Sequence, residues 1–160
     1  MSCWRRFDVY DGQMPVDWNH AQKKAARTGR WAVTMAKVRI RRVLSRTHWQ
    51  LISICGPSGG ESVGVVDMVA MRKDHRKPAN GLRRGDLLQI ILIQVKGGTA
   101  AMPTEDDAIR LRGVARQHRA RAVLLASWKK GKAARFFRLR RSGVKGTQWA
   151  ELHDLDTVFH

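Results

Sequence analysis

Apolar residues occur in short runs along the chain, and glycine, proline or basic residues separate these runs. Runs that are wholly apolar, or that alternate apolar with polar residues, predict five β-strands, at 48–55, 63–71, 87–96, 122–128 and 135–139. The segment GPSGG at 56–60 and the pair Asn80-Gly81 supply turns between the first three strands. The last stretch, 149–160, is compatible with a strand or with a helix.

Two longer stretches have the spacing of helices. No proline lies between His20 and Ser45, and apolar residues recur there at helical spacing with Arg and Lys on the other sides. Gly29 leaves open whether this is one helix with a break or two pieces. Pro103 and Thr104 begin a second helix, in which Thr104 is the expected N-cap and Asp107 completes a variant of the capping box.

The order is therefore helix, three strands, helix, then one or two further strands. This predicts an α/β (α+β) fold with a central mixed sheet of four to five strands flanked by helices. The helix between the third and fourth strands makes a right-handed crossover natural, so that pair is expected to be parallel. Residues 1–19 are predicted to be an irregular lead-in, and residues 20–160 a single domain.

The net charge of the chain indicates what kind of partner it binds. The 160 residues include 31 Lys+Arg against 13 Asp+Glu, which gives a formal net charge of +18. Such a domain is expected to bind a polyanion, and nucleic acid is the first choice. No segment predicts a membrane span, a signal-peptide core or a membrane-surface helix. Cys3 and Cys55 lack metal-site spacing, so a cytoplasmic protein with reduced thiols is expected.

Polar residues stand where the third apolar run ends, in the segment LLQIILIQVKGG. Gln94 and Lys96 share one face of this strand. If the turn centres near Asn80, antiparallel pairing brings Asp67 opposite a position near residue 93. A carboxylate on an apolar face needs a partner, and either Lys96 or a divalent cation would supply one. A metal site with a lysine beside it and a structural ion pair both fit these three residues.

The segments GVVD, ending at Asp67, and IQVK, ending at Lys96, resemble the motif of the PD-(D/E)XK nuclease superfamily, which includes Holliday-junction resolvases. The resemblance covers roughly 48–139 and implies a restriction-endonuclease-like α-β-β-β-α-β core. It also implies that Asp67 binds Mg²⁺ or Mn²⁺, that Gln94 stands at the second acidic position as a further metal ligand, and that Lys96 is the catalytic lysine. Val66 replaces the proline of the motif, and Gln94 replaces the acid in a Gln-x-Lys variant.

Other carboxylates are candidates for the missing acid. Glu61, in the turn before the second strand, is either an additional ligand or a solvated turn residue. Members of the superfamily that carry a glutamate in the first helix use it as a further metal ligand. This helix has no glutamate, so Asp17, just before it, is the candidate for that role. Residues 105–107 are acidic, but helix capping explains them without a catalytic role.

Basic and aromatic residues are expected to form the nucleic-acid-binding surface. The predicted contacts are Arg72, Lys73, Arg76, Lys77, Arg83, Arg84, Trp128, Lys129 and Lys130. Gly97 and Gly98 either let a phosphate approach the strand end or only form the turn before the second helix.

The sequence thus favours a metal-dependent endonuclease that hydrolyses phosphodiester bonds in nucleic acid, with DNA preferred to RNA. The alternative is a catalytically inactive nucleic-acid-binding protein of the same fold, and a further one is an RNA-associated structural protein. Analogy with small nucleases suggests a homodimer.

Overall fold

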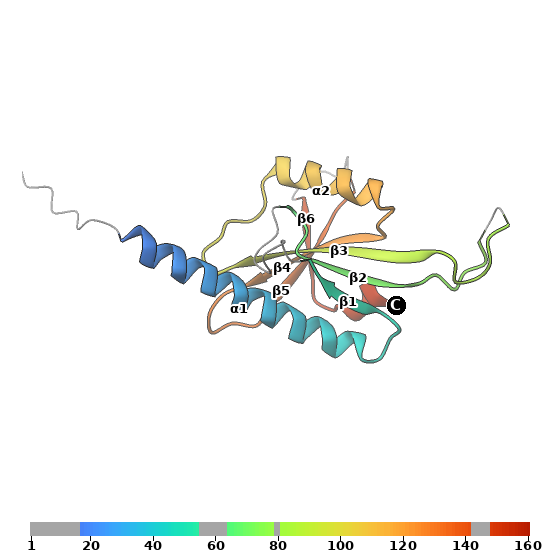
Figure 1. Ribbon diagram of the computed structural model, residues 1–160, viewed down its shortest axis with the longest axis horizontal. Helices are drawn as coiled ribbons and strands as arrows, with labels where there is room; N and C mark the ends of the chain where they lie inside the picture. Colours follow the sequence, from blue (N-terminus) through green and yellow to red (C-terminus); the bar gives the residue numbers. More distant parts are fainter. Residues whose placement is uncertain (1–16, 55–63, 79–80, 142–147) are drawn as a thin grey trace, which may run out of the picture.

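The computed structural model describes residues 17–54, 64–78, 81–141 and 148–160. Its elements, in chain order, are α1 (Trp18–Leu44), β1 (Gln50–Ser53), β2 (Met68–Lys73), β3 (Leu88–Gly97), α2 (Glu105–Gln117), β4 (Ala122–Trp128), β5 (Arg135–Leu139), β6 (Trp149–Leu152) and α3 (Asp156–Phe159) (Figure 1). No helix of the described residues is long and apolar enough to cross a bilayer.

Within the described residues, six strands form one sheet in the order β1 to β6. Every neighbouring pair is antiparallel except β3 and β4, which are parallel and connected through α2. The mixed α+β class, the α-β-β-β-α-β order and the parallel pair are confirmed. The predicted four to five strands are one or two too few, because the ambiguous last stretch forms both a strand, β6, and a helix, α3.

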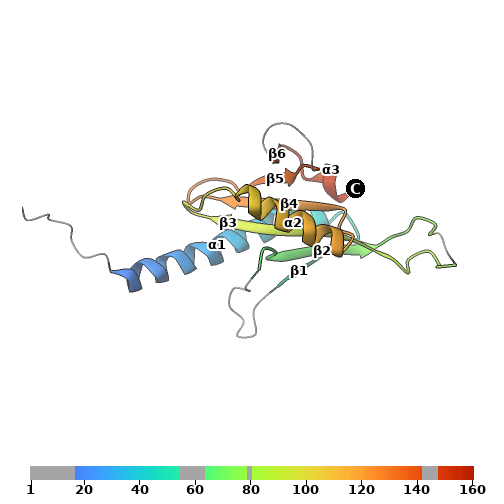
Figure 2. The same cartoon turned by 90° about the horizontal axis from the view of Figure 1, so that it is seen from above.

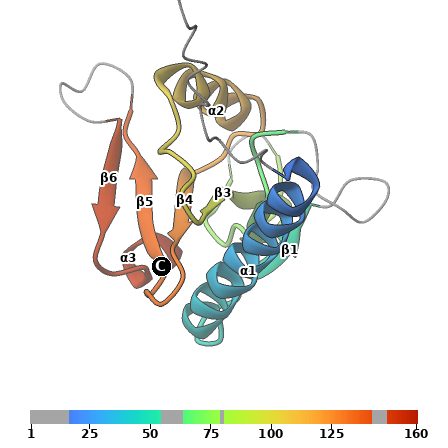
Figure 3. The ribbon, with the colours of Figure 1, turned by 90° about the vertical axis from the view of Figure 1, so that its left-hand side faces the viewer.

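Helices cover both faces of the sheet. α1 and α2 lie on opposite sides of it (Figures 2 and 3), and α3 packs on the same side as α1. The core between the sheet and α1 includes Ile40, Met68, Ile91, Ile93, Leu124 and Phe159. The core on the α2 side includes Leu92, Leu111, Val123, Leu125 and Trp149. Alternate residues of β3 and β4 therefore belong to different cores, as expected for strands buried on both faces.

Helix α1 owes its position to one apolar stripe. Its fully buried residues recur every fourth position, at Ala32, Ala36, Ile40 and Leu44. The helix runs unbroken through Gly29 and begins at Trp18, two residues before the predicted start at His20. The carboxylate of Asp17 caps it by accepting a hydrogen bond from the N–H of His20 at 3.1 Å.

Helix α2 begins as the sequence predicts. The Thr104 hydroxyl accepts from the N–H of Asp107, and the Asp107 carboxylate accepts from the N–H of Thr104, each at 3.2 Å. This reciprocal pair is the capping box, so it explains Asp107 as a structural residue.

The strand boundaries differ from prediction only at the start of the sheet. β4 and β5 have the predicted limits, and β3 is shifted by one residue. β1 is confined to Gln50–Ser53, and β2 begins at Met68 rather than at residue 63, so that Asp67 lies just before the strand and not within it.

Two glycines at the end of β3 allow α1 to lie close to the sheet. A Cβ on Gly97 would lie 2.7 Å from the Cβ of Ala32 and 3.2 Å from the carbonyl oxygen of Thr28. Gly98 has φ +67°, and a Cβ there would lie 2.9 Å from the Thr28 methyl group. The sequence suggested either a phosphate contact or a simple turn for these glycines. In the structure, they allow close packing against α1.

We expect Gly97→Ala to lower the free energy of unfolding by about 1 to 3 kcal/mol, because the new methyl group overlaps Ala32 in a packed contact. Gly113→Ala is the matched control. Gly113 lies in α2, and a Cβ added there would have no atom within 4 Å, so alanine should raise stability by about 0.5 to 1 kcal/mol. Urea unfolding of both variants measures the difference, and equal effects would contradict the packing role.

Candidate functional site

Asp67 lies beside the polar end of β3. One oxygen of its carboxylate, Oδ2, accepts a hydrogen bond from the main-chain N–H of Val95 at 2.6 Å. Its own N–H donates to the carbonyl of Ile93 at 2.9 Å. Because Val95 separates Gln94 from Lys96, the first hydrogen bond brings the carboxylate to the middle of the predicted motif.

The pairing of β2 with β3 produces this arrangement. Met68 is the Cα partner of Ile93, and the register continues to Lys73 and Leu88. The predicted position of Asp67, opposite a residue near 93, is confirmed. β2 begins only at Met68, opposite Ile93, and the side chain of Asp67, just before the strand, supplies the acceptor for the N–H of Val95. Asp67 thus also has a structural function.

Gln94 points to the α2 side of the sheet. It alternates with Ile93, which belongs to the α1 core, and shares its face with Leu92, which belongs to the α2 core. It is 6% exposed, and its Oε1 has no hydrogen-bond partner among the described residues. A buried amide oxygen without a donor costs about 1 to 3 kcal/mol, so an additional partner at this point would stabilise the protein. By the same alternation, the half-buried Lys96 lies on this face.

The donor set fits a magnesium ion in part. Mg²⁺ prefers oxygen ligands and is commonly held by one or two carboxylates with several waters. The structure supplies one carboxylate, at Asp67, and one unsatisfied amide oxygen, at Gln94. Among the described residues there is no group of three or more His, Cys, Asp or Glu that could hold a metal.

The two further carboxylates considered from the sequence do not complete this set. Glu61 lies outside the described residues. Asp17 caps α1, and it precedes Thr28, which faces Gly98, by about 16 Å along the helix axis at 1.5 Å per residue.

Basic side chains surround this end of the sheet. β4 runs parallel to β3 and pairs Lys96 with Ser127 and Gly97 with Trp128. The half-buried Trp128 and the exposed Lys129 and Lys130 therefore lie at the same end as Lys96.

The first three turns of α1 add cations that sequence reasoning missed. Every residue from 17 to 27 is exposed, and this part of the helix projects beyond the sheet (Figure 1). Its basic residues are Lys23, Lys24 and Arg27, and no acidic residue occurs in the whole helix. The sequence contained a sign of this basic surface, because the predicted helix has Lys and Arg residues and no Asp or Glu.

The hairpin residues in the predicted binding set lie at the opposite end of the sheet. β2 and β3 are joined by a long hairpin that projects away from α2 and the β4–β5 turn (Figure 1), and it carries Arg72, Lys73, Arg76, Lys77, Arg83 and Arg84. The predicted binding residues therefore form two groups rather than one continuous surface.

Asp74 ties down the base of this hairpin. Its carboxylate forms a bidentate ion pair with Arg76, with the shortest contact 2.6 Å, and also accepts from the amide of Gln89 at 3.1 Å. Its main-chain N–H donates to the carbonyl of Leu87, and its carbonyl accepts from Gly85. The hydrogen bonds from Arg76 hold the pKa of Asp74 far below its ordinary value. The charge of Arg76 is thus largely neutralised within the protein.

Comparison with known proteins gives little beyond the fold. No protein-family model and no curated protein sequence matches the chain. Among solved structures, it is similar to Hjc, a Holliday junction resolvase from the archaeal hyperthermophile Archaeoglobus fulgidus. The identity is 19%, the match covers 82% of this chain and 91% of that one, and the TM-score is 0.43.

The depressed pKa of Asp74 predicts a pH dependence of stability. The folded protein holds the carboxylate ionised more strongly than the unfolded chain, so its contribution is complete at neutral pH and is lost progressively below about pH 4. Asp74→Asn should therefore unfold at lower urea concentration than the wild type at pH 7, and the two midpoints should converge as the pH falls from 5 to 2.5. A constant difference across this range would contradict the assignment.

Proposed function

We propose that the protein is a metal-dependent endonuclease that hydrolyses phosphodiester bonds in DNA. The observation that carries the proposal is the convergence of a carboxylate and a Gln-x-Lys segment at one end of the sheet, joined by the hydrogen bond from Val95 to Asp67. The basic residues of α1 and of the β4–β5 turn at the same end provide contacts for phosphates.

Each residue of the site has a distinct role in this proposal. The Asp67 carboxylate and the Gln94 amide oxygen would hold Mg²⁺ or Mn²⁺, which prefers oxygen ligands. The metal, when bound, polarises the phosphate and lowers the pKa of a bound water. The Lys96 ammonium lies one residue beyond Val95 on the same strand, where it can orient the attacking water and stabilise the charge that develops on the phosphate.

The second candidate is a nucleic-acid-binding protein of the same fold without catalysis. The neutral Gln94 favours it, because an amide at the acidic position leaves one charged ligand for the metal. The two candidates differ in metal-dependent cleavage and not in binding, so cleavage is the property to measure.

Labelled DNA and RNA, incubated with Mg²⁺ or Mn²⁺ and separately with a chelator, test the proposal. We expect cleavage of DNA in the presence of metal and a loss of about 100-fold or more in both Asp67→Asn and Lys96→Ala. Asparagine retains an oxygen that can accept from Val95, so Asp67→Asn removes the charge and preserves the structural hydrogen bond.

Asp86→Asn is the matched control. It makes the same change of charge at an exposed hairpin residue remote from the site, and it should leave cleavage unchanged. Cleavage that survives Asp67→Asn or Lys96→Ala would overturn these residue roles. Tight binding without cleavage under all conditions would favour the second candidate.

Gln94→Glu tests the metal site independently of catalysis. A second buried carboxylate next to Asp67 should lower the melting temperature without metal, because burial and like charge raise its pKa. It should also lower the Mg²⁺ concentration needed for thermal stabilisation on the order of tenfold, because ligand charge sets affinity. A thermal shift that does not depend on Mg²⁺ in the variant would argue against metal binding between residues 67 and 94.

A further inference from the structure

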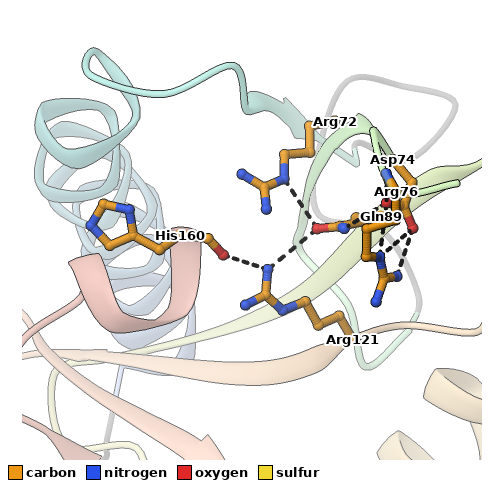
Figure 4. A network of polar contacts seen from close by, with 6 residues as sticks. All are labelled: Arg72, Asp74, Arg76, Gln89, Arg121 and His160. Carbon is orange, nitrogen blue, oxygen red and sulfur yellow. Dashed lines mark hydrogen bonds and ion pairs between the residues drawn. The ribbon is translucent and has the colours of Figure 1, made fainter. Parts of the chain in front are cut away.

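An arginine-rich pocket lies at the base of the β2–β3 hairpin, at the opposite end of the sheet from Asp67. Its volume is about 860 Å³, and segments far apart in the sequence line it, from β2, β3, the α2–β4 turn, the end of β5 and the last residue of the chain. Its six cationic side chains are Arg72, Lys73, Arg76, Arg119, Arg121 and Arg141, and its one side-chain carboxylate is Asp74. Part of this arrangement is seen in Figure 4.

The carboxylate does not balance this charge. Asp74 forms its bidentate ion pair with Arg76, so these two side chains neutralise each other. The Gln89 amide group is then fixed, because its Nε2 donates to Asp74 at 3.1 Å and its oxygen faces the other arginines. The other five cations of the pocket have no side-chain carboxylate partner among the described residues.

Two of these cations converge on a single neutral acceptor. Arg72 Nε and Arg121 Nη1 both donate to Gln89 Oε1, at 3.0 and 3.3 Å (Figure 4). Burial and the charge of Arg121 lower the pKa of Arg72. Like charges held this close repel each other, and an anion between them would remove the repulsion.

Main-chain oxygens hold both guanidinium groups in place. Arg121 Nη1 donates to the main-chain oxygen of His160 at 2.6 Å, and Arg72 Nη1 donates to the carbonyl of Phe159 at 3.4 Å. The Arg72 guanidinium also stacks on Trp49, 4.7 Å from the ring centroid. Each arginine has five N–H donors, so several are still available after these bonds. The pocket is therefore organised before any ligand arrives.

Arg119 gives an independent reason to assign a ligand to this pocket. It has φ +50°, the one positive value at a non-glycine residue among the described residues. The N–H of Arg119 bonds to the carbonyl of Arg116, and that of Ala120 bonds to Ala115, which is the Schellman motif that ends α2. This position favours glycine, because a side chain in the left-handed region is strained. An arginine in this strained position is therefore a candidate for a functional side chain.

We propose that this pocket binds a phosphate group of the nucleic-acid backbone, as a second contact remote from the site of chemistry. Phosphate matches the pocket because its oxygens accept hydrogen bonds from several guanidinium groups at once. Gln89 and Lys96 are seven positions apart on β3, so the two sites lie about 23 Å apart along the strand and on opposite faces of the sheet. The inference rests on the nucleic-acid binding in the proposed function but not on catalysis.

Arg119→Gly separates a binding role from a structural one. Removing the strained side chain should raise the melting temperature by roughly 2 to 4 °C. The same variant should show a smaller thermal stabilisation by pyrophosphate and about three-fold or greater loss of DNA affinity in chelator, with a salt dependence shallower by about one unit. A gain of stability together with a loss of binding cannot come from misfolding.

Arg141→Gln is the second variant, because its side chain has no hydrogen bond among the described residues, and it should weaken both kinds of binding as well. Arg138→Gln is the charge-matched control on β5 outside the pocket, and it should bind like the wild type. Wild-type binding in both pocket variants, or an equal loss in the control, would overturn the assignment. Loss of pyrophosphate binding with unchanged DNA affinity would assign the pocket to a free phosphate compound instead and so overturn the nucleic-acid contact.

Because these assays contain chelator, their outcome is independent of cleavage. Absence of cleavage with intact Arg119-dependent DNA binding would refute the proposed catalysis and leave the pocket standing. Metal-dependent cleavage with DNA binding unchanged in the pocket variants would support the proposed catalysis and refute the phosphate contact in the pocket.

Discussion

The close contact between α1 and the end of β3 is the constraint on which the arrangement of the site depends. With no side chain at Gly97 or Gly98, Thr28 and Ala32 lie directly against the strand that carries Gln94 and Lys96. This contact fixes the helix at the polar end of the sheet, and it directs the acid-free first turns of the helix past that end. One packing requirement thus places a basic helix at the same end of the sheet as the candidate catalytic residues, on the face opposite Gln94 and Lys96.

One side chain at this end of the sheet, Asp67, both stabilises the fold and belongs to the proposed catalytic site. The Asp67 carboxylate completes the hydrogen bonding of β3 just before β2 begins, and it is also the charged metal ligand in the proposed site. Asp67 is therefore constrained by both roles. A substitution that removes the side-chain oxygen would break the hydrogen bond to β3, and one that removes the charge would weaken metal binding in the proposed site. Gln94 differs from Asp67, because its buried side-chain oxygen makes no hydrogen bond within the described residues and so does not stabilise the fold.

Local signals in the sequence predicted the elements well and the sites only partly. The strand at 122–128 is a continuous apolar run bounded by basic turns, and the Thr104 capping box needs four residues, so both could be identified without tertiary information. The alternation around Asp67 suggested a strand continuing through it, whereas β2 starts just after it, at Met68, and the Asp67 side chain serves as the acceptor for the Val95 N–H of β3. That hydrogen bond depends on pairing across 28 residues. The arginine pocket was not predictable because it needs several separate segments and a positive φ at Arg119 that no local pattern requires.

The way Asp74 closes the hairpin has a consequence for how this protein can vary. Main-chain bonds to Leu87 and Gly85, together with the side-chain bonds to Arg76 and Gln89, complete the turn network at the base, so the strand register does not depend on what lies further out. Insertions, deletions or exchanges of charge beyond this point should be tolerated by the fold. The hairpin is therefore the part of the molecule where relatives can acquire different partners while the sheet and both sites are preserved.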